Sequence, residues 1–163
     1  MNPENFGVKK IEVRKAEFLS KLESVLEKCG LFVTNIDFDQ CYDSTINKEL
    51  VDIITRKCPN LQEIDVGFQN FEINNRIDVL MPIFDKLKRF DCAFDEYDKA
   101  TNDKDLGNLL LLNEKLEFFS ISSNNILNGN FLNAIRGESM KELIITFGRN
   151  IPFHTICRVS KFL

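Results

Sequence analysis

The sequence predicts an α/β fold, a right-handed solenoid (horseshoe) of about six irregular repeats with parallel strands on the concave side and helices outside. The first observation is a short pattern, apolar-x-x-apolar-x-apolar, that recurs at intervals of 24 to 29 residues. The second is that the spacing of apolar residues changes after each occurrence from two to about 3.6, as it does where a strand gives way to a helix. The third is a length of 163 residues, 44% of them hydrophobic, which suits one domain or one slice of a repeat array.

Six strands are expected, one at each occurrence of the pattern. Their first apolar residues are Val8, Val33, Leu61, Leu87, Leu116 and Met140. A helix is expected after each strand, with apolar residues along one face in the ranges 18–29, 46–58, 77–84, 106–112, 131–135 and 156–163. Ser44 or Thr45 is the expected N-cap of the second helix, and Pro82 is expected to split or kink the third, because proline lacks a backbone donor.

Two segments resemble a known repeat sequence. Residues 56–66, RKCPNLQEIDV, resemble the C-P-N-L-x-x-L-x-L junction of the cysteine-containing leucine-rich repeats found in F-box substrate receptors of ubiquitin ligases. Residues 116–127, LEFFSISSNNIL, match L-x-x-L-x-L-x-x-N-x-x-L with Asn124 in the asparagine position, and Cys41 occupies that position after the second strand. The resemblance implies a protein–protein interaction module that recognises substrates for an SCF-type (F-box) ubiquitin ligase. The alternative is a leucine-rich-repeat scaffold or regulator unrelated to ubiquitination.

The expected organisation is a single domain, residues 1–163. An F-box of about 40 residues does not fit ahead of the first strand, so contact with a ligase adaptor is expected only where an upstream F-box exists. Solenoids normally carry polar caps at both ends, and the sequence shows none. We therefore expect either a fragment of a longer protein or a chain that pairs with another molecule at one end.

The predicted partner-binding site is the concave face of the sheet. Side chains alternate along a strand, so the residues between the inward apolar positions point to this face. The candidate residues are Glu12, Asp37, Asp39, Glu63, Asp65, Arg89, Asp91, Phe118 and Ser120. Their acids would form a stripe that receives Lys or Arg from a protein or peptide, with Phe118 as an apolar anchor. The same acids could instead only keep the face solvated, and a shift in register would move Phe118 into the core.

Charge and cysteine content exclude several classes. The net charge of −4 disfavours nucleic acid and anionic membrane surfaces as partners. The amino terminus lacks the features of a secretory signal, and the longest purely apolar run is only Leu109 to Leu112, so no membrane span is expected. Five cysteines without a C-x-x-C pair favour reduced, buried thiols over zinc or disulfides. An intracellular protein, cytoplasmic or nuclear, is the expectation.

No enzyme, cofactor or metal site is expected. His154 is the only histidine, and no cysteine or serine partner can be identified for it. The acidic segment 91–105 offers oxygen ligands but lacks the glycine and glutamate spacing of an EF-hand. The chain also has no glycine-rich phosphate loop and no nucleophile elbow.

Overall fold

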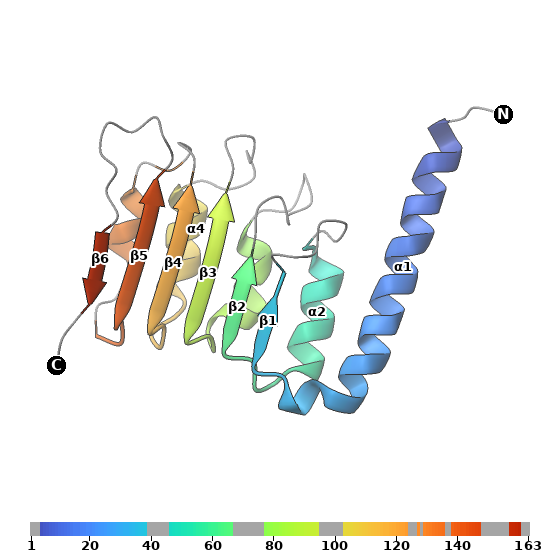
Figure 1. Ribbon diagram of the computed structural model, residues 1–163, viewed down its shortest axis with the longest axis horizontal. Coiled ribbons are helices and arrows are strands. Elements are labelled where there is room, and N and C mark those ends of the chain that lie inside the picture. Colours follow the sequence, from blue (N-terminus) through green and yellow to red (C-terminus); the bar gives the residue numbers. More distant parts are fainter. Residues whose placement is uncertain are drawn as a thin grey trace.

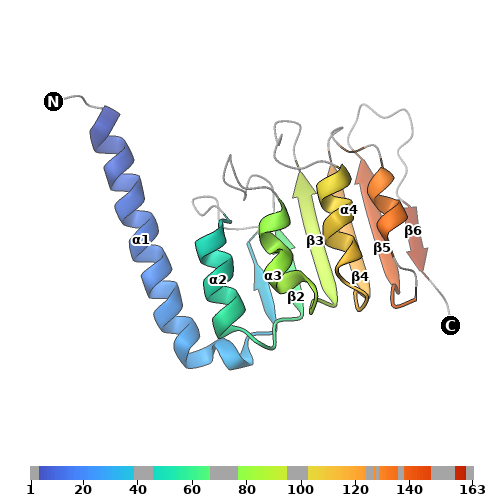
Figure 2. The ribbon, with the colours of Figure 1, turned by 180° about the vertical axis from the view of Figure 1, so that it is seen from behind.

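The computed structural model describes residues 4–38, 46–66, 77–94, 103–123, 127, 129–135, 138–147 and 157–160, with the side chains in these ranges except those of residues 4–15, 94, 123, 147 and 157–160. A six-stranded sheet forms one layer, and helices lie against one of its faces (Figures 1 and 2). In the described part of the chain no helix lies on the opposite face, which is turned toward the viewer in Figure 1. The fold is therefore a two-layer α/β structure.

The strands lie side by side in their order along the chain. They are β1 (Asn35–Asp37), β2 (Glu63–Val66), β3 (Arg89–Phe94), β4 (Phe118–Ser123), β5 (Glu142–Phe147) and β6 (Cys157–Ser160). Strands β1 to β5 are parallel, and each begins two residues after the first apolar residue of its pattern, so these five predicted strands are confirmed. In Figure 2 the helices face the viewer and each following strand lies to the right, so the crossovers are right-handed.

The helices agree with the predicted ranges in the middle of the chain. They are α1 (Glu4–Cys29), α2 (Lys48–Lys57), α3 (Met81–Phe84) and α4 (Asp103–Leu111), with 3-10 turns η1 (Gly30–Phe32), η2 (Ile77–Leu80) and η3 (Asn130–Ala134). The N-cap of α2 is Asn47 rather than Ser44 or Thr45, because the Asn47 side chain accepts a hydrogen bond from the Leu50 N–H at 2.9 Å. The third helix is split as predicted, with Pro82 in the first turn of α3, where a missing N–H is tolerated.

The first predicted strand is wrong, because α1 runs without interruption from Glu4 to Cys29. Val8 and Ile11 are three residues apart, a spacing that fits one face of a helix as well as the start of the strand pattern. The surrounding segment is rich in Glu and Lys, which are good helix formers. Glu12 therefore lies in a helix and not in the sheet.

The last predicted helix is also wrong, because residues Cys157–Ser160 form β6, which pairs antiparallel with β5. Leu143 lies opposite Val159, and Ile145 lies opposite Cys157. The apolar residues of this segment therefore follow the strand period of two. The extra strand covers an edge of β5 that would otherwise be open.

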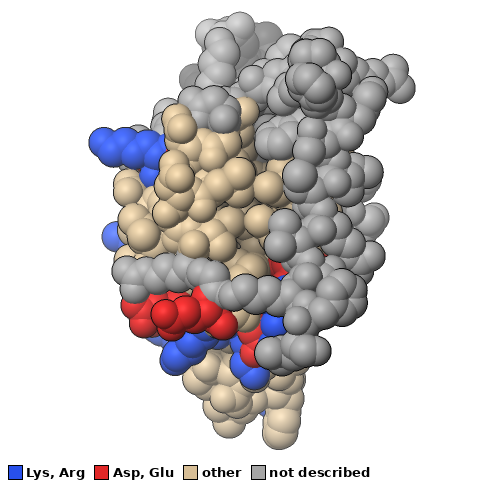
Figure 3. Space-filling model, turned by 90° about the vertical axis from the view of Figure 1, so that its left-hand side faces the viewer, with Lys and Arg blue, Asp and Glu red and all other residues tan. Residues whose placement is uncertain are grey.

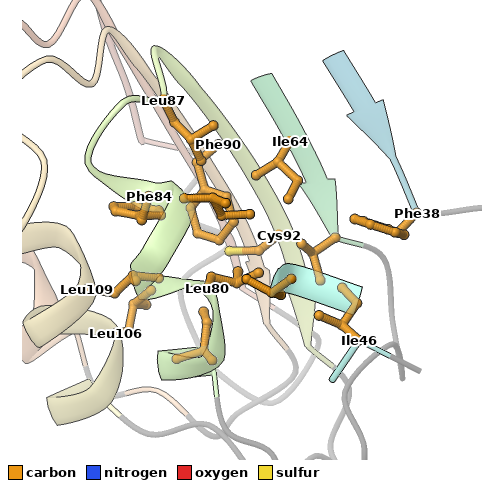
Figure 4. Packing of buried hydrophobic residues seen from close by; sticks show 14 of the residues in the cluster. Phe38, Ile46, Ile64, Leu80, Phe84, Leu87, Phe90, Cys92, Leu106 and Leu109 are labelled. Carbon is orange, nitrogen blue, oxygen red and sulfur yellow. The ribbon is translucent and has the colours of Figure 1, made fainter. Parts of the chain in front are cut away.

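The core lies between the sheet and the helices (Figure 4). Four phenylalanines run through it, beginning with Phe84 against Phe90 in an edge-to-face contact of 5.0 Å between ring centroids. Phe90 then stacks on Phe119 at 5.9 Å, and Phe119 meets Phe131 edge-to-face at 6.2 Å. Since Phe90 and Phe119 occupy the middle inward position of β3 and β4, these rings join successive repeats.

The turns that precede the strands are also joined from one repeat to the next. The Asn60 amide donates to the Leu31 carbonyl at 2.7 Å, and the Lys86 ammonium donates to the Cys58 carbonyl at 2.9 Å. The Ser139 hydroxyl donates in the same way to the Glu114 carbonyl at 2.6 Å. In each case a side chain reaches back to the turn of the preceding repeat, so the turns stack in line with the strands.

Candidate functional site

The candidate site is the open face, the outward side chains of β1 to β5. Pairing of the strands places them in two rows across the sheet. The middle row consists of Asp37, Asp65, Asp91, Ser120 and Ile144. The row beside it consists of Asn35, Glu63, Arg89, Phe118 and Glu142. Both rows agree with the predicted register, so the structure brings together seven of the nine candidate residues.

The other two candidates are not part of the described face. Glu12 is in α1, so its place in the acidic stripe was predicted wrongly. Asp39 follows β1 but lies outside the described residues. The stripe therefore begins at Asp37 and is one acid shorter than the sequence predicts.

Three carboxylates occupy consecutive strands in the middle row. Asp37 is exposed, and Asp65 and Asp91 are half-buried. Neighbouring strands lie about 4.8 Å apart, so the three acids span about 10 Å. Beneath them, burial raises the pKa of the Cys92 thiol well above its ordinary value, and the charges of Asp91 and Asp65 raise this pKa further. Three carboxylates within about 10 Å concentrate negative charge in the middle row.

Arg89 connects the acidic stripe to an aromatic ring. Its Nε donates to the Asp91 carboxylate at 2.8 Å, and its guanidinium carbon lies 3.7 Å from the centroid of the Phe118 ring. This is the geometry of a cation–π contact. The arginine therefore offsets part of the charge of Asp91 and lies over the aromatic side chain.

Phe118 lies on the open face. It pairs in register with Arg89 and Glu142, while the neighbouring Phe119 is fully buried in the core. Phe118 is half-buried, so part of its ring can contact a partner. With Ile144, which is also half-buried, it makes the β4–β5 side of the face less polar than the β1–β3 side.

Charged residues just before the strands form a further row that the sequence interpretation did not include. Lys88, Glu117 and Lys141 precede β3, β4 and β5, and Lys141 pairs with Glu117 at 2.6 Å. The hydrogen bond from Lys141 lowers the pKa of Glu117. Seen from the β6 end, acidic and basic side chains gather toward the lower part of the surface, and most of the described surface above them is uncharged (Figure 3). These residues directly precede Arg89, Phe118 and Glu142, so the predicted register of the strands would have revealed this row as well.

A metal-binding or small-molecule site would need a cluster of metal ligands or an enclosed cavity. In the described ranges, no three His, Cys, Asp or Glu side chains gather in a way that could hold a metal ion. An open hollow of about 560 Å³ lies beside α2, where it is lined by Lys48, Glu49, Asp52, Thr55 and Arg56. His154 lies outside the described residues. The hollow beside α2 includes none of the seven candidate residues of the open face.

Comparison with known proteins identifies no relative of this chain. A scan against protein-family models finds no match, and searches of curated proteins and of solved structures find none either. Among the described residues, no helix is both long enough and apolar enough to cross a membrane. The conclusions about function therefore depend on the open face itself.

Proposed function

We propose that this chain is a protein-recognition module, a leucine-rich-repeat solenoid whose open face binds an extended protein segment that carries Lys or Arg. The observation that carries the proposal is the register of β1, β2 and β3, which aligns Asp37, Asp65 and Asp91 in one row beside Arg89 and Phe118. Parallel strands covered by helices on one side leave the other side available to a partner.

The spacing of the acids defines the partner. In an extended polyproline II conformation, residues i and i+3 lie on the same side about 9 Å apart. Two basic residues at this spacing could reach Asp37 and Asp91 together, since these acids are two strand spacings apart. An apolar side chain further along the segment would then contact Phe118. A partner of this kind has a basic part followed by an apolar part.

The competing explanation is that the acids only keep the face hydrated. The two explanations differ in the effect of removing the charges. Truncating a desolvated acid at an interface costs about 2–5 kcal/mol of binding free energy. Truncating an acid at the rim mainly changes the association rate and its salt dependence. A solvated face would contribute nothing to the affinity.

The test replaces Asp37, Asp65 and Asp91 together by Asn. Partners are recovered with the wild-type chain, and their affinities for the wild type and the variant are measured at low salt. The proposal predicts a loss of at least about tenfold. Unchanged affinity, with circular dichroism showing an intact fold, would leave the acids as a solvated face.

The matched control removes three acids from the helix side. Glu49→Gln, Asp52→Asn and Asp85→Asn change the net charge by the same amount, and all three residues are exposed and lie in α2 or at the end of α3. This variant should keep wild-type affinity. An equal loss in both variants would mean that the partner responds to the overall charge and not to the row on the open face.

The narrower form of the proposal is substrate recognition for an F-box ubiquitin ligase. Its support is the segment 56–66 with its resemblance to cysteine-containing repeats. Cys58 there is buried at the end of α2, and Asn60 bonds back to the Leu31 carbonyl. The test is co-purification of the full-length protein with the adaptor subunit of such a ligase. Failure to co-purify would favour the scaffold or regulator role instead.

A further inference from the structure

The helix layer extends one unit further than the sheet at the β1 end of the molecule. Helix α1 lies beside α2 and is tied to it by ion pairs from Glu23 to Arg56 and from Glu27 to Lys57. In the sheet, by contrast, β1 is the first strand and pairs only with β2 in the described part of the chain. Figures 1 and 2 show α1 extending beyond β1 with no strand in front of it.

The side of α1 next to this position carries two exposed apolar side chains. Glu23 faces the outer side of α2, and Leu19 and Leu26 are buried. A rotation of about 100° per residue places Phe18 and Val25 on the flank opposite Glu23, toward the sheet layer. Phe18 is 44% exposed and Val25 is 56% exposed.

The corresponding side chains of the next repeat are buried. The register of β1 and β2 aligns Phe18 with Ile46 and Val25 with Ile53, and both isoleucines are at most 4% exposed. The exposure of Phe18 and Val25 therefore follows from the missing strand position beneath α1, and not from the amphipathic pattern of the helix.

Phe32 in the turn η1 points to the same position. Strand register aligns it with Asn60, Lys86 and Ser139, the three side chains that reach back to the preceding repeat. The first repeat has a phenylalanine here that is 82% exposed. A large apolar side chain is unusual at such a position, and it suits contact with an apolar neighbour.

We propose that Phe18, Val25, Phe32 and the outer edge of β1, together the end surface, bind an extended segment of a partner protein that adds to the sheet as a strand beside β1. The molecule's own repeats indicate the occupant. Every strand from β2 to β5 lies parallel to its predecessor and turns alternate apolar side chains toward the helix layer. The partner segment therefore has apolar residues at alternate positions. Its contacts are those of β-strand addition.

A second copy of the chain fits this position less well than a separate segment does. The strands β1 to β5 each come with a helix layer of their own chain behind them (Figure 2). The edge strand β1 of a second copy would bring its own helices into the space that α1 already fills. The other edge strand, β6, has no described helix over it, and the sedimentation experiment below tests that arrangement. A segment without a helix of its own meets no such obstacle, and it can lie beneath α1.

The test uses a defined probe, a synthetic peptide with the sequence of residues 59–66, PNLQEIDV, which has the apolar pattern of the neighbouring strand. The full chain, isotope-labelled, is titrated with this peptide and followed by NMR. We expect saturable shifts at Phe18, Val25 and 35–37, with a dissociation constant below about 1 mM. A peptide of the same composition with the alternation of apolar residues removed should cause no shifts.

Two variants separate this site from unspecific binding. Phe32→Asn introduces the residue found at the aligned position of the next repeat and should weaken binding at least about tenfold. Leu112→Asn, at a residue 46% exposed just after α4, is the matched control and should bind as the wild type does. Both side chains are exposed, so both variants should keep the thermal unfolding curve of the wild type.

Results of three kinds would overturn the proposal. One is the absence of binding at peptide concentrations up to about 1 mM. Another is a set of shifts confined to the open face, or equal affinity for the wild type and Phe32→Asn. The third is self-association of the chain that Phe32→Asn abolishes in sedimentation experiments, which would assign the end surface to a second copy.

Discussion

Gly30 offers the sharpest test of how closely α1 and α2 are joined. A Cβ atom added at this residue would lie 2.2 Å from the Lys57 carbonyl oxygen and 2.9 Å from the Lys57 carbonyl carbon. Both atoms belong to the backbone at the end of α2, so they cannot move aside as a flexible side chain could. Overpacking of this kind costs about 1–3 kcal/mol, and this cost exceeds the gain of about 0.4–1 kcal/mol from a less flexible unfolded chain.

The net cost of about 0.5–2 kcal/mol should make Gly30→Ala lower the melting temperature by about 1–8 °C, since each kcal/mol corresponds to about 2–4 °C in a chain of this size. Gly107→Ala is the control. Its Cβ would meet the Phe131 Cα at 3.7 Å and the Ala134 Cβ at 3.8 Å, which are ordinary contacts. Gly107 lies inside α4, where alanine is favoured over glycine by about 0.5–1 kcal/mol. The control should therefore raise the melting temperature. A neutral Gly30→Ala, or the same sign for both variants, would refute the reasoning.

Four further predictions concern the core. Asn113→Ala should destabilise the fold by about 1–3 kcal/mol in urea unfolding, because the Leu87 carbonyl loses the amide that donates to it at 2.7 Å. The Phe84 carbonyl also loses an amide bond, at 2.6 Å, but it keeps a bond from the Leu87 N–H at 3.2 Å. Phe119→Ala removes a fully buried ring that contacts two others and should cost about 3–5 kcal/mol in the same assay. Burial raises the pKa values of Cys58 and Cys92, so both thiols should resist alkylation in the native chain, as mass spectrometry of each cysteine would show. Because the unfolded thiols ionise first, the stability that these two groups contribute should fall as the pH rises above about 9.

The sequence predicted the middle of the fold better than its ends. Between Leu61 and Ile145 each strand has a neighbouring strand on both sides, so its inward residues must be apolar and the period of two is visible. At the amino end, Val8 and Ile11 have a spacing that both a helix and a strand allow. At the carboxyl end, Val159 belongs to a strand because the edge of β5 is available for pairing. That condition is a property of the sheet and not of the local residues.

The open face was predictable because its rows follow from register alone. Once the inward residues of β1 to β4 were identified, the positions of Asp37, Asp65 and Phe118 followed from alternation. The contacts among these residues were not predictable. Arg89 could have reached along its own strand or across to a neighbour, and it does both, since it binds Asp91 and covers Phe118. Rotamers of long side chains are decided by such local competition.

The end surface could not be predicted, because it arises from the replacement of a strand by part of α1. If residues 8–13 had formed a strand, its inward side chains would have covered Phe18 and Val25, and its turn would have faced Phe32. The uninterrupted helix keeps the helix layer complete and ends the sheet one unit earlier. Because residues 8–13 are helical, Glu12 is not part of the acidic stripe, and an apolar edge is left beside β1. The chain therefore presents two adjoining surfaces of different chemistry, a charged sheet face and an apolar strand edge.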